Sequence, residues 1–190
     1  MTIAIAKDEV FNFMYRANVD ALASMGGTVF FSPLRDKLLP LCDFLYLPGG
    51  YPELYAEQLA ENVTMRESIY QYAMDCGRVF AECGGFMYLC SDIDGKEMCG
   101  VFPMRATMAS SRLHLGYRQM SIDDKIVRGH EFHYSSICKE ELHDGIRRYC
   151  IQRSAKGEPV DTPLYKYKNV LAGYTHWYWA ETSFELLWRL

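Results

Sequence analysis

Two signatures of nucleotide and metal sites are missing from this sequence of 190 residues. No Gly-x-x-x-x-Gly-Lys-Ser/Thr segment occurs, so a Walker-type ATP site is excluded from this chain. The seven cysteines form no C-x-x-C pair and show no other spacing typical of metal ligands. We therefore expect neither a bound nucleotide nor a metal ion in this chain.

The chain also lacks long apolar runs and an excess of positive charge. No apolar stretch approaches the about 18 residues of a membrane span, and the first residues form no basic leader, so we expect neither a membrane segment nor a signal peptide. The net charge of −4 gives no broad attraction for nucleic acid or anionic membranes. Seven cysteines are an odd number without a disulfide framework, which is typical of the reducing cytoplasm.

What is present suffices for one domain with a substantial core. With 190 residues, 49% of them hydrophobic, we treat residues 1–190 as a single domain. Short apolar strands alternate with helices, a pattern typical of βαβ units that build a parallel sheet covered on both faces. We expect strands at 2–6, 28–31, 44–47, 79–81 and 170–174, helices at 18–25, 53–60, 64–76 and 183–190, and paired strands at 117–122 and 126–134. Residues 139–152 are weakly patterned, and residues 153–168 are predicted to be an exposed loop or hairpin.

The segment from Val79 to Leu89 is the centre of the functional prediction. Its apolar residues stop at Glu82, Cys83 and two glycines, which indicates a buried strand that turns sharply into a helix. At the tip of such a turn Cys83 takes a strained backbone conformation, and Gly84 and Gly85 supply the small neighbours that the turn requires. The positive end of the following helix would favour the thiolate of Cys83 over the thiol. The alternative is a buried cysteine that serves only as a small hydrophobic residue.

A cysteine that attacks a carbonyl group needs a base to take its proton. Histidine suits this task because its pKa lies near neutral pH, and the sequence offers His114, His130, His133, His143 and His176. His176 follows a predicted strand, so we expect it at the same edge of the sheet as Cys83. His114 and His143 are expected at the surface.

The attack also needs hydrogen-bond donors for the oxyanion that forms. The residues from Pro48 to Pro52 end the third strand abruptly, because two prolines and two glycines continue neither strand nor helix. The amide of Gly84, next to the nucleophile, and the amide of either Gly49 or Gly50 are the expected donors.

Four segments of the chain occur in a characteristic order: Leu47 to Glu53, Ala81 to Leu89, Gly129 to Ser135, and Gly173 to His176. Together they resemble the glutamine amidotransferase domain of cobyrinic acid a,c-diamide synthases. The resemblance implies an α/β fold of the class I glutamine amidotransferase type, a flavodoxin-like three-layer sandwich around a mostly parallel central sheet. It also implies a glutaminase in which Cys83 attacks the side-chain amide of glutamine to form a glutamyl thioester, with His176 as base and acid.

The resemblance further implies how the substrate is held. The segment from Gly129 to Ser135 would hold glutamine or face a synthetase partner, with Glu131 and His133 as the side chains that contact glutamine. The glutamine and oxyanion site would also include Gly49, Gly50, Gly84 and Gly85. The alternative for Glu131 and His133 is a hydrogen-bonded strand whose polar groups only satisfy one another.

In the full synthases an N-terminal domain binds ATP and Mg²⁺ and activates acetate carboxylates of a corrin precursor, which the released ammonia then amidates. A related branch amidates a nickel tetrapyrrole, and the sequence does not separate the two. That ATP-binding domain is absent here, so the chain would be the amidotransferase component of a ligase and act with a synthetase domain or subunit. The resemblance leaves self-association open.

One departure from the family concerns the third member of the catalytic triad. Class I amidotransferases usually place Glu two residues after the catalytic His, and here that residue is Tyr178. Tyr178, Glu181 and Glu82 remain open as substitutes, and loss of a triad acid can reduce the rate by several powers of ten. The alternatives are therefore an amidotransferase-like binding domain with weakened catalysis, or an elbow-cysteine hydrolase of the same fold.

Overall fold

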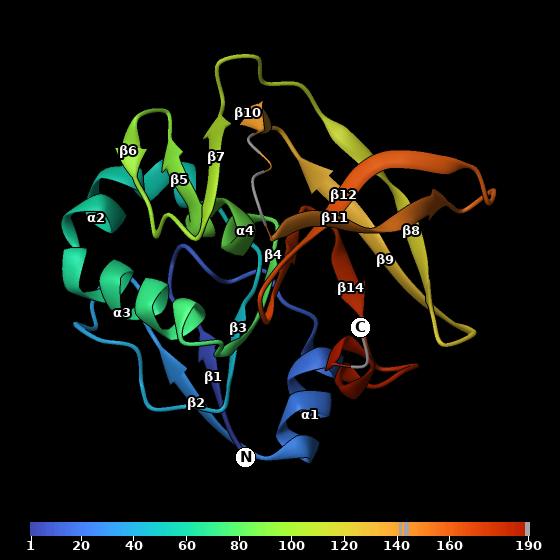
Figure 1. Ribbon diagram of the computed structural model, residues 1–190, viewed down its shortest axis with the longest axis horizontal. Coiled ribbons are helices and arrows are strands. Elements are labelled where there is room, and N and C mark those ends of the chain that lie inside the picture. Colours follow the sequence, from blue (N-terminus) through green and yellow to red (C-terminus); the bar gives the residue numbers. More distant parts are fainter. Residues whose placement is uncertain (141, 143–144, 189–190) are drawn as a thin grey trace.

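The computed structural model describes residues 1–140, 142 and 145–188. Its ten-stranded sheet has a parallel half and an antiparallel half (Figure 1). The parallel half has the order β13-β4-β3-β1-β2 and consists of β1 (Thr2–Ala6), β2 (Gly27–Phe31), β3 (Phe44–Leu47), β4 (Arg78–Glu82) and β13 (Val170–Gly173). The ranges expected for these strands are confirmed to within one residue at either end.

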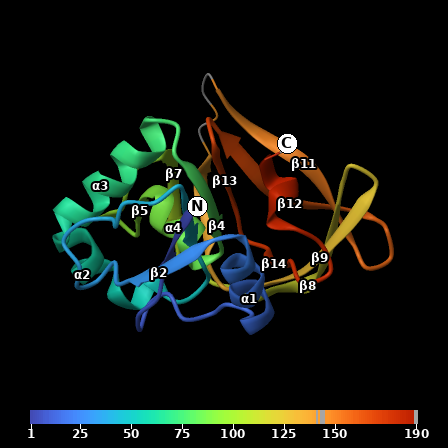
Figure 2. The same cartoon turned by 90° about the horizontal axis from the view of Figure 1, so that it is seen from below.

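Two cores lie on opposite faces of the parallel half, because successive side chains of a strand point in opposite directions. Ala4 and Leu45 pack with the helices α2 (Ala56–Glu61), α3 (Val63–Met74) and α4 (Gly84–Leu89), and the short 3-10 helix η1 (Pro52–Tyr55) precedes α2. Ile3 and Phe44 pack on the other face with α1 (Arg16–Met25) and the 3-10 helix η2 (Phe184–Trp188). Figures 1 and 2 both show α2 and α3 on one side of these strands and α1 on the other. The expected three-layer α/β sandwich is confirmed.

The antiparallel half continues from β13 in the order β12-β11-β8-β9-β14. The sheet is therefore mixed rather than mostly parallel as expected, because the second half of the chain returns through hairpins instead of helical crossovers. Its strands are β8 (His114–Ile122), β9 (Lys125–His133), β11 (Ile146–Ser154), β12 (Pro159–Tyr167) and β14 (His176–Tyr178). The β8–β9 pair was expected. Residues 153–168 were expected to form an exposed loop or a hairpin, and the structure shows a hairpin of β11 and β12. The two strands are longer than the sequence indicates, because charged residues along them hide the alternation that is typical of a strand.

A second sheet covers the end of α4 and has the order β10-β7-β5-β6. Its strands are β5 (Cys90–Ile93), β6 (Lys96–Glu97), β7 (Phe102–Thr107) and β10 (Ser136–Glu140). The sequence did not predict this sheet. The closing helix expected at 183–190 is a shorter 3-10 helix, η2, and residues 189–190 lie outside the described part of the chain. Among the described residues no helix combines the length and apolarity needed to cross a membrane.

Candidate active site

Cys83 occupies the sharp turn between β4 and α4. Its backbone angles are φ 47° and ψ −106°, a conformation that non-glycine residues adopt rarely and at an energetic cost. The Cys83 N–H donates to the carbonyl of Gly173 at 2.8 Å, and its own carbonyl accepts from the Met87 N–H at 3.0 Å. A β-carbon on Gly85 would lie 2.2 Å from the Leu47 carbonyl oxygen, so this position admits only glycine. The predicted strand, strained tip and helix are confirmed.

The sulfur of Cys83 is neutral rather than anionic. Only 6% of the residue is exposed, and burial raises its pKa to about 12. Hydrogen bonding from the amides of Gly84 and Gly50 lowers this pKa but does not offset the burial. The expectation that the start of the helix favours the thiolate is therefore wrong, because α4 has six residues and desolvation is the larger effect on the pKa of Cys83.

The two amides at the sulfur identify the oxyanion donors. The Gly49 N–H is already bonded to the carbonyl of Phe13 at 3.1 Å, and the Phe13 N–H returns a bond of 3.1 Å to the Gly49 carbonyl. Gly50 and Gly84 are the residues whose amides hydrogen-bond toward Cys83. Of the two alternatives that the sequence left open, Gly50 is the one whose amide faces Cys83.

His176 begins β14, and its imidazole lies in a narrow slot. The ring of His130 stacks on it with centroids 4.9 Å apart, and the edge of Phe13 meets it at 4.6 Å. The backbone of Gly49 also packs closely against this imidazole, because a β-carbon on Gly49 would lie 2.2 Å from Cε1 of His176. Burial, with His130 and His133 nearby, lowers the pKa of His176 to about 3, so this imidazole is neutral and able to accept a proton.

Cys83 and His176, 93 residues apart in the sequence, line the same cavity of about 300 Å³. Its other lining residues are Phe13, Gly50, Tyr51, His130 and Phe132. None of Phe13, Tyr51, His130 and Phe132 was predicted as a site side chain, although His130 and Phe132 lie in the segment from Gly129 to Ser135 that was expected to hold glutamine or face a partner. A signal for two of them was present, since the alternation of β9 puts His130 and Phe132 on one face, but the sequence does not say which face of β9 meets Cys83.

Comparison with known proteins agrees with this geometry. Residues 2–184 match the model of the CobB/CobQ-like glutamine amidotransferase domain. The chain belongs to this family. It is 38% identical over 186 residues to a cobyrinate a,c-diamide synthase from Clostridium acetobutylicum, covering 93% of this chain and 42% of the relative. It is 40% identical over 185 residues to the synthase of the same name from Fusobacterium nucleatum subsp. nucleatum, covering 92% of this chain and 40% of the relative.

Solved structures support the fold of this CobB/CobQ-like domain. PurLQS from Thermotoga maritima superposes with a TM-score of 0.60 at 16% identity, over 92% of this chain and 86% of that chain. A glutamine amidotransferase from the same organism gives a TM-score of 0.59 at 13% identity, over 92% of this chain and 75% of that chain. The class I glutamine amidotransferase fold implied by the sequence motifs is confirmed. The domain spans about two fifths of the length of the synthases from Clostridium and Fusobacterium.

Glu131 and His133 of the amidotransferase domain lie on the opposite face of β9 from the cavity that contains Cys83. Glu131 Oε1 bonds to His133 Nε2 at 2.7 Å, and Glu131 Oε2 accepts from Arg118 and from Thr162. The second ring nitrogen of His133 bonds to the carbonyl of Ser135 at 2.8 Å. This geometry does not support direct contact with glutamine; it matches the alternative of a strand whose polar groups satisfy one another.

The same cluster offers the ligand atoms of His114, Glu131 and His133 within 4.8 Å of one another. The rings of His114 and His133 lie parallel, at 3° with centroids 4.7 Å apart, so their in-plane lone pairs do not converge on one point. The carboxylate of Glu131 is already ion-paired with the guanidinium of Arg118, which would compete with a metal ion. This arrangement is a poor fit for a metal ion. His114 is half-buried rather than at the surface as expected, and His143 lies outside the described residues.

None of the three candidates for the missing triad acid contacts the imidazole of His176. Glu82 Oε1 accepts from the backbone N–H of Trp177 at 2.8 Å, and burial raises the pKa of this carboxyl to about 8. Glu181 forms an exposed ion pair with Arg128 at 2.8 Å. The ring of Tyr178 packs edge-on against Tyr15 at 5.3 Å. Within the described residues, Nδ1 of His176 is buried without a hydrogen-bond partner.

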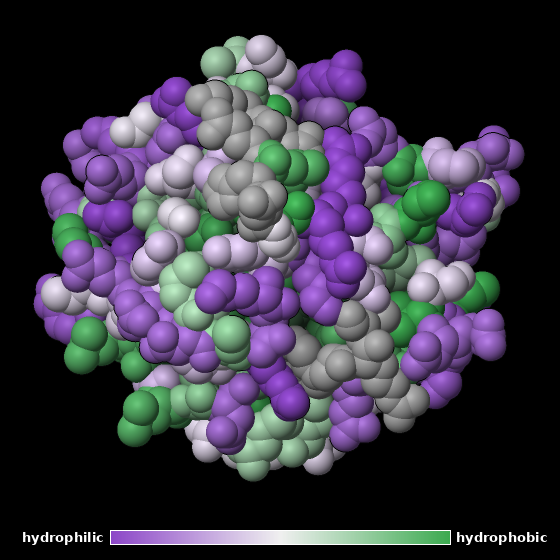
Figure 3. Space-filling view, viewed as in Figure 1, coloured by the Kyte–Doolittle hydropathy of each residue, from purple (hydrophilic) through white to green (hydrophobic). Residues whose placement is uncertain are grey.

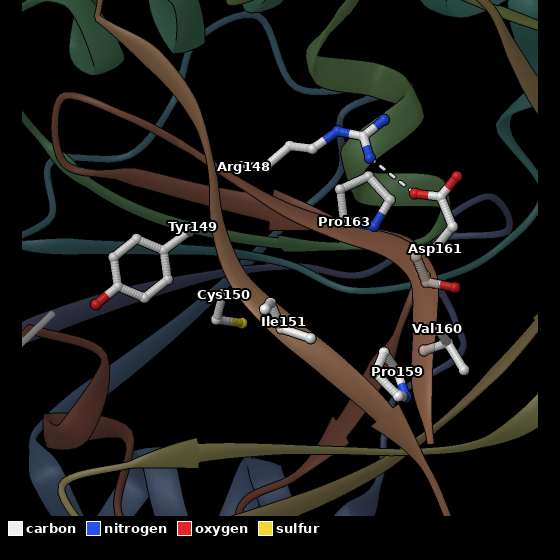
Figure 4. A pocket seen from close by; sticks show the side chains of 9 residues that line it. Arg148, Tyr149, Cys150, Ile151, Pro159, Val160, Asp161 and Pro163 are labelled. Carbon is white, nitrogen blue, oxygen red and sulfur yellow. Dashed lines mark hydrogen bonds and ion pairs between the residues drawn. The ribbon is translucent and has the colours of Figure 1, made fainter. Parts of the chain in front are cut away.

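A larger cavity of about 550 Å³ opens between β11 and β12 of the amidotransferase domain (Figure 4). It arises where the pairing shifts, because Cys150 faces Leu164 while Gln152 faces Val160, which leaves more residues on β12 than on β11. Arg148 and Asp161 at this cavity form an ion pair of 2.7 Å, and burial raises the pKa of Cys150 to about 11. Cys150 lines this cavity, but in the part of the chain that the structure describes no histidine that could act as base and no glycine amide like those beside Cys83 lines it.

Proposed function

We propose that this chain is a single glutaminase domain, residues 1–190, that hydrolyses glutamine through a thioester on Cys83. The observation that carries the proposal is the shared cavity, which is lined by the strained Cys83, the neutral imidazole of His176 and Gly50. The amide of Gly84 lies next to the same sulfur. These are the three requirements of acyl transfer to a cysteine: a nucleophile, a base and an oxyanion site.

The first half of the reaction forms the thioester. As the sulfur of Cys83 attacks the side-chain carbonyl carbon of glutamine, the thiol proton passes to the imidazole of His176. The oxyanion that forms is held by the N–H groups of Gly50 and Gly84, and each such donor typically lowers the barrier by about 3 kcal/mol. When the tetrahedral species collapses, His176 returns its proton to the leaving nitrogen. Ammonia departs and the glutamyl group remains on Cys83.

The second half releases glutamate. His176, neutral again, takes a proton from a water molecule, whose oxygen attacks the thioester carbonyl. The same two amides hold the second oxyanion. Collapse breaks the carbon–sulfur bond, and the proton on His176 returns to the sulfur, which restores the neutral thiol. The low pKa of His176 keeps its imidazole unprotonated before the attack and makes the protonated ring a strong acid toward the leaving group.

We further propose that the ammonia serves a synthetase domain or subunit that binds ATP and Mg²⁺ and activates carboxylates of a corrin or related tetrapyrrole. The curated relatives carry the name cobyrinate a,c-diamide synthase and are longer than this chain, which supports such a partner. Seven free cysteines support a location in the reducing cytoplasm.

The outer face of the β8–β9 hairpin is the surface that we assign to this partner. Leu115, Tyr117, Phe132 and Tyr134 are exposed there, and Phe132 also lines the cavity of Cys83. Figure 3 shows hydrophilic and hydrophobic residues mixed over the front of the molecule, with separate hydrophobic side chains on the right, where Figure 1 draws β8, β9 and the hairpin of β11 and β12. An apolar surface beside the cavity suits a partner that must receive ammonia before water protonates it.

Glutamate release from glutamine tests the first proposal. We expect Cys83→Ala and His176→Ala to abolish it, whereas Cys76→Ala, at an exposed cysteine, should leave it unchanged. A glutamine-like chloroketone should label Cys83 and spare the other cysteines, as seen by peptide mass spectrometry. Activity retained in Cys83→Ala would overturn the proposal. So would glutamine binding without turnover in the presence of synthetase and ATP, which would select the binding-domain alternative.

A double variant tests the partner surface. Leu115→Ser with Tyr117→Ser should keep glutamine hydrolysis by the chain alone and lose amidation when synthetase, ATP and acceptor are supplied. Leu41→Ser is the control, because Leu41 is 96% exposed but is not part of this face. Equal amidation by the double variant and the control would overturn the assignment of this face.

A further inference from the structure

The imidazole of His176 has no acid to orient it, yet it is held in one place. In cysteine and serine hydrolases a carboxylate usually bonds to the second ring nitrogen and fixes the orientation of the imidazole. Here Nδ1 of His176 is buried without a partner among the described residues, and Glu82, Tyr178 and Glu181 bond or pack elsewhere. Another contact must therefore keep the ring in position.

The contacts that remain are aromatic, and His130 makes the one that is stacked face to face. His130 and His176 are direct cross-strand partners in the β9–β14 pair, so their side chains leave the sheet side by side on one face. Their rings stack with centroids 4.9 Å apart and planes at 19°. The edge of Phe13 closes the slot, 4.6 Å from His176 and 5.6 Å from His130.

His130 is itself anchored from outside the sheet. Its Nδ1 lies 2.5 Å from the hydroxyl of Tyr15, a residue of the segment between β1 and α1. Tyr15 in turn packs edge-on against Tyr178 at 5.3 Å. A ring fixed at one nitrogen by a hydrogen bond keeps its plane, so it can impose that plane on the ring stacked against it. Packing and hydrogen bonding together hold catalytic side chains in this way.

We propose that His130, anchored by Tyr15, is a positioning residue that fixes the imidazole of His176 by stacking, in place of the hydrogen-bonded acid of a triad. The inference rests on the proposed glutaminase reaction and assigns His130 a role in it. Burial lowers the pKa of His130, which favours the neutral form of its ring. The titratable groups around the pair are Tyr15, Tyr117, Tyr178, Glu82, Cys83, His133 and Arg128.

Three variants and one matched control test the inference with the whole chain. His130→Ala removes the stacked ring, His130→Phe keeps a ring but loses the bond to Tyr15, and Tyr15→Phe keeps both rings and loses only the bond. His114→Ala is the control, because it removes a stacked imidazole of similar geometry, 4.7 Å from His133, on the opposite face of the same hairpin. Thermal unfolding of each variant shows that it is folded.

We expect His130→Ala to lower kcat for glutamine hydrolysis by about 100-fold with KM changed less than about threefold, since a misplaced catalytic group costs turnover rather than binding. His130→Phe should recover about tenfold of that loss. Tyr15→Phe keeps the stacked ring but loses its anchor, so its kcat should lie between those of His130→Ala and wild type, and a kcat equal to wild type would rule out the anchoring role of Tyr15. The acid limb of kcat/KM should move to higher pH by about one unit in His130→Ala, because water then reaches His176. A purely structural defect would leave this limb in place.

Equal kcat and an equal acid limb in His130→Ala and His114→Ala would overturn the inference, as would a loss confined to KM, which would make His130 a substrate-binding residue. The rate at which a glutamine-like chloroketone labels Cys83 gives a second readout and should fall in the same order. If Cys83→Ala is as active as wild type, the glutaminase proposal itself fails. If Cys83→Ala is inactive and His130→Ala is normal, only the role of His130 fails.

Discussion

The carboxylate of Glu82 accepts a hydrogen bond of 2.8 Å from the backbone N–H of Trp177, so the residue before the nucleophile holds the residue after the base. Tyr46 donates its hydroxyl to the other oxygen of Glu82 at 2.7 Å. Glu82 is fully enclosed beneath the sheet edge. It joins the two halves of the candidate site through the backbone and not through the imidazole.

This buried carboxyl predicts a dependence of stability on pH. The pKa of Glu82 rises from 4.5 to about 8 on folding, so between these values the folded protein holds a proton that the unfolded chain has lost. The contribution of Glu82 to the free energy of unfolding should therefore fall as pH rises through this window, by at most about 1.4 kcal/mol per pH unit. The lowered pKa of His176 contributes the opposite slope below about pH 6.5, so the test compares two proteins. In urea unfolding between pH 5 and 8, Glu82→Gln, which has no such proton, should lose the contribution of Glu82 and show a more positive slope than wild type. An unchanged slope would mean that Glu82 is ionised in the folded protein.

The neutral thiol predicts an uneven reactivity among the cysteines. Burial raises the pKa of Cys83 to about 12, so at pH 7.5 iodoacetamide should modify it at least about tenfold more slowly than the exposed residues Cys76 and Cys138. A glutamine-like chloroketone should reverse this order, because binding places its carbon at the sulfur beside His176. Peptide mass spectrometry over time measures both rates. Fast, preferential modification of Cys83 by iodoacetamide would contradict the prediction.

The backbone at Gly50 predicts a position where even alanine is not tolerated. Gly50 has φ +155°, and a β-carbon there would lie 1.6 Å from the carbonyl oxygen of Val10. Gly50→Ala should destabilise the fold by at least about 2 kcal/mol and move an oxyanion donor. Gly27→Ala is the matched control, since nothing lies within 4 Å of its added carbon. Thermal unfolding and glutaminase assays should separate the two variants, and equal behaviour would refute the close approach of Val10.

The contrast between a buried and an exposed ion pair gives a further prediction. Glu131 and Arg118 are largely buried, whereas Glu181 and Arg128 are exposed. Glu131→Gln leaves the Arg118 charge without its partner and should lower the free energy of unfolding by about 3 kcal/mol. Glu181→Gln should change it by less than about 1 kcal/mol. Denaturant unfolding at pH 7 measures both, and similar small effects would show that water reaches Arg118.

The lowered pKa of Glu131 predicts a loss of stability in acid. Burial alone would raise the pKa of Glu131, but hydrogen bonds from His133 and Thr162 and the charge of Arg118 lower it to about 2. A lowered pKa stabilises the fold above the ordinary value of 4.5, and this stabilisation is lost as pH falls from 4.5 toward 2. Wild type should therefore lose stability across this range more steeply than Glu131→Gln. Parallel pH profiles for the two proteins would contradict the assigned cause.

The sequence by itself determined the parallel half of the sheet, the turn at Cys83 and the choice of His176. Each of these follows from local pattern: an apolar run that ends at glycines must leave a sheet, and its last residue must lie at the carboxyl edge. The motif order was sufficient to indicate the amidotransferase family, which the comparison of residues 2–184 then established.

Only the tertiary structure decided which groups meet at that edge. Gly49 bonds to Phe13, whereas Gly50 lines the cavity of Cys83. Strand β9 turns His130 and Phe132 toward Cys83 and turns Glu131 and His133 away. The neutral state of the Cys83 thiol depends on how much water is excluded around it. These outcomes depend on contacts between residues far apart in the chain, and the periodicity of a strand is the same for either face, so no local pattern contains them.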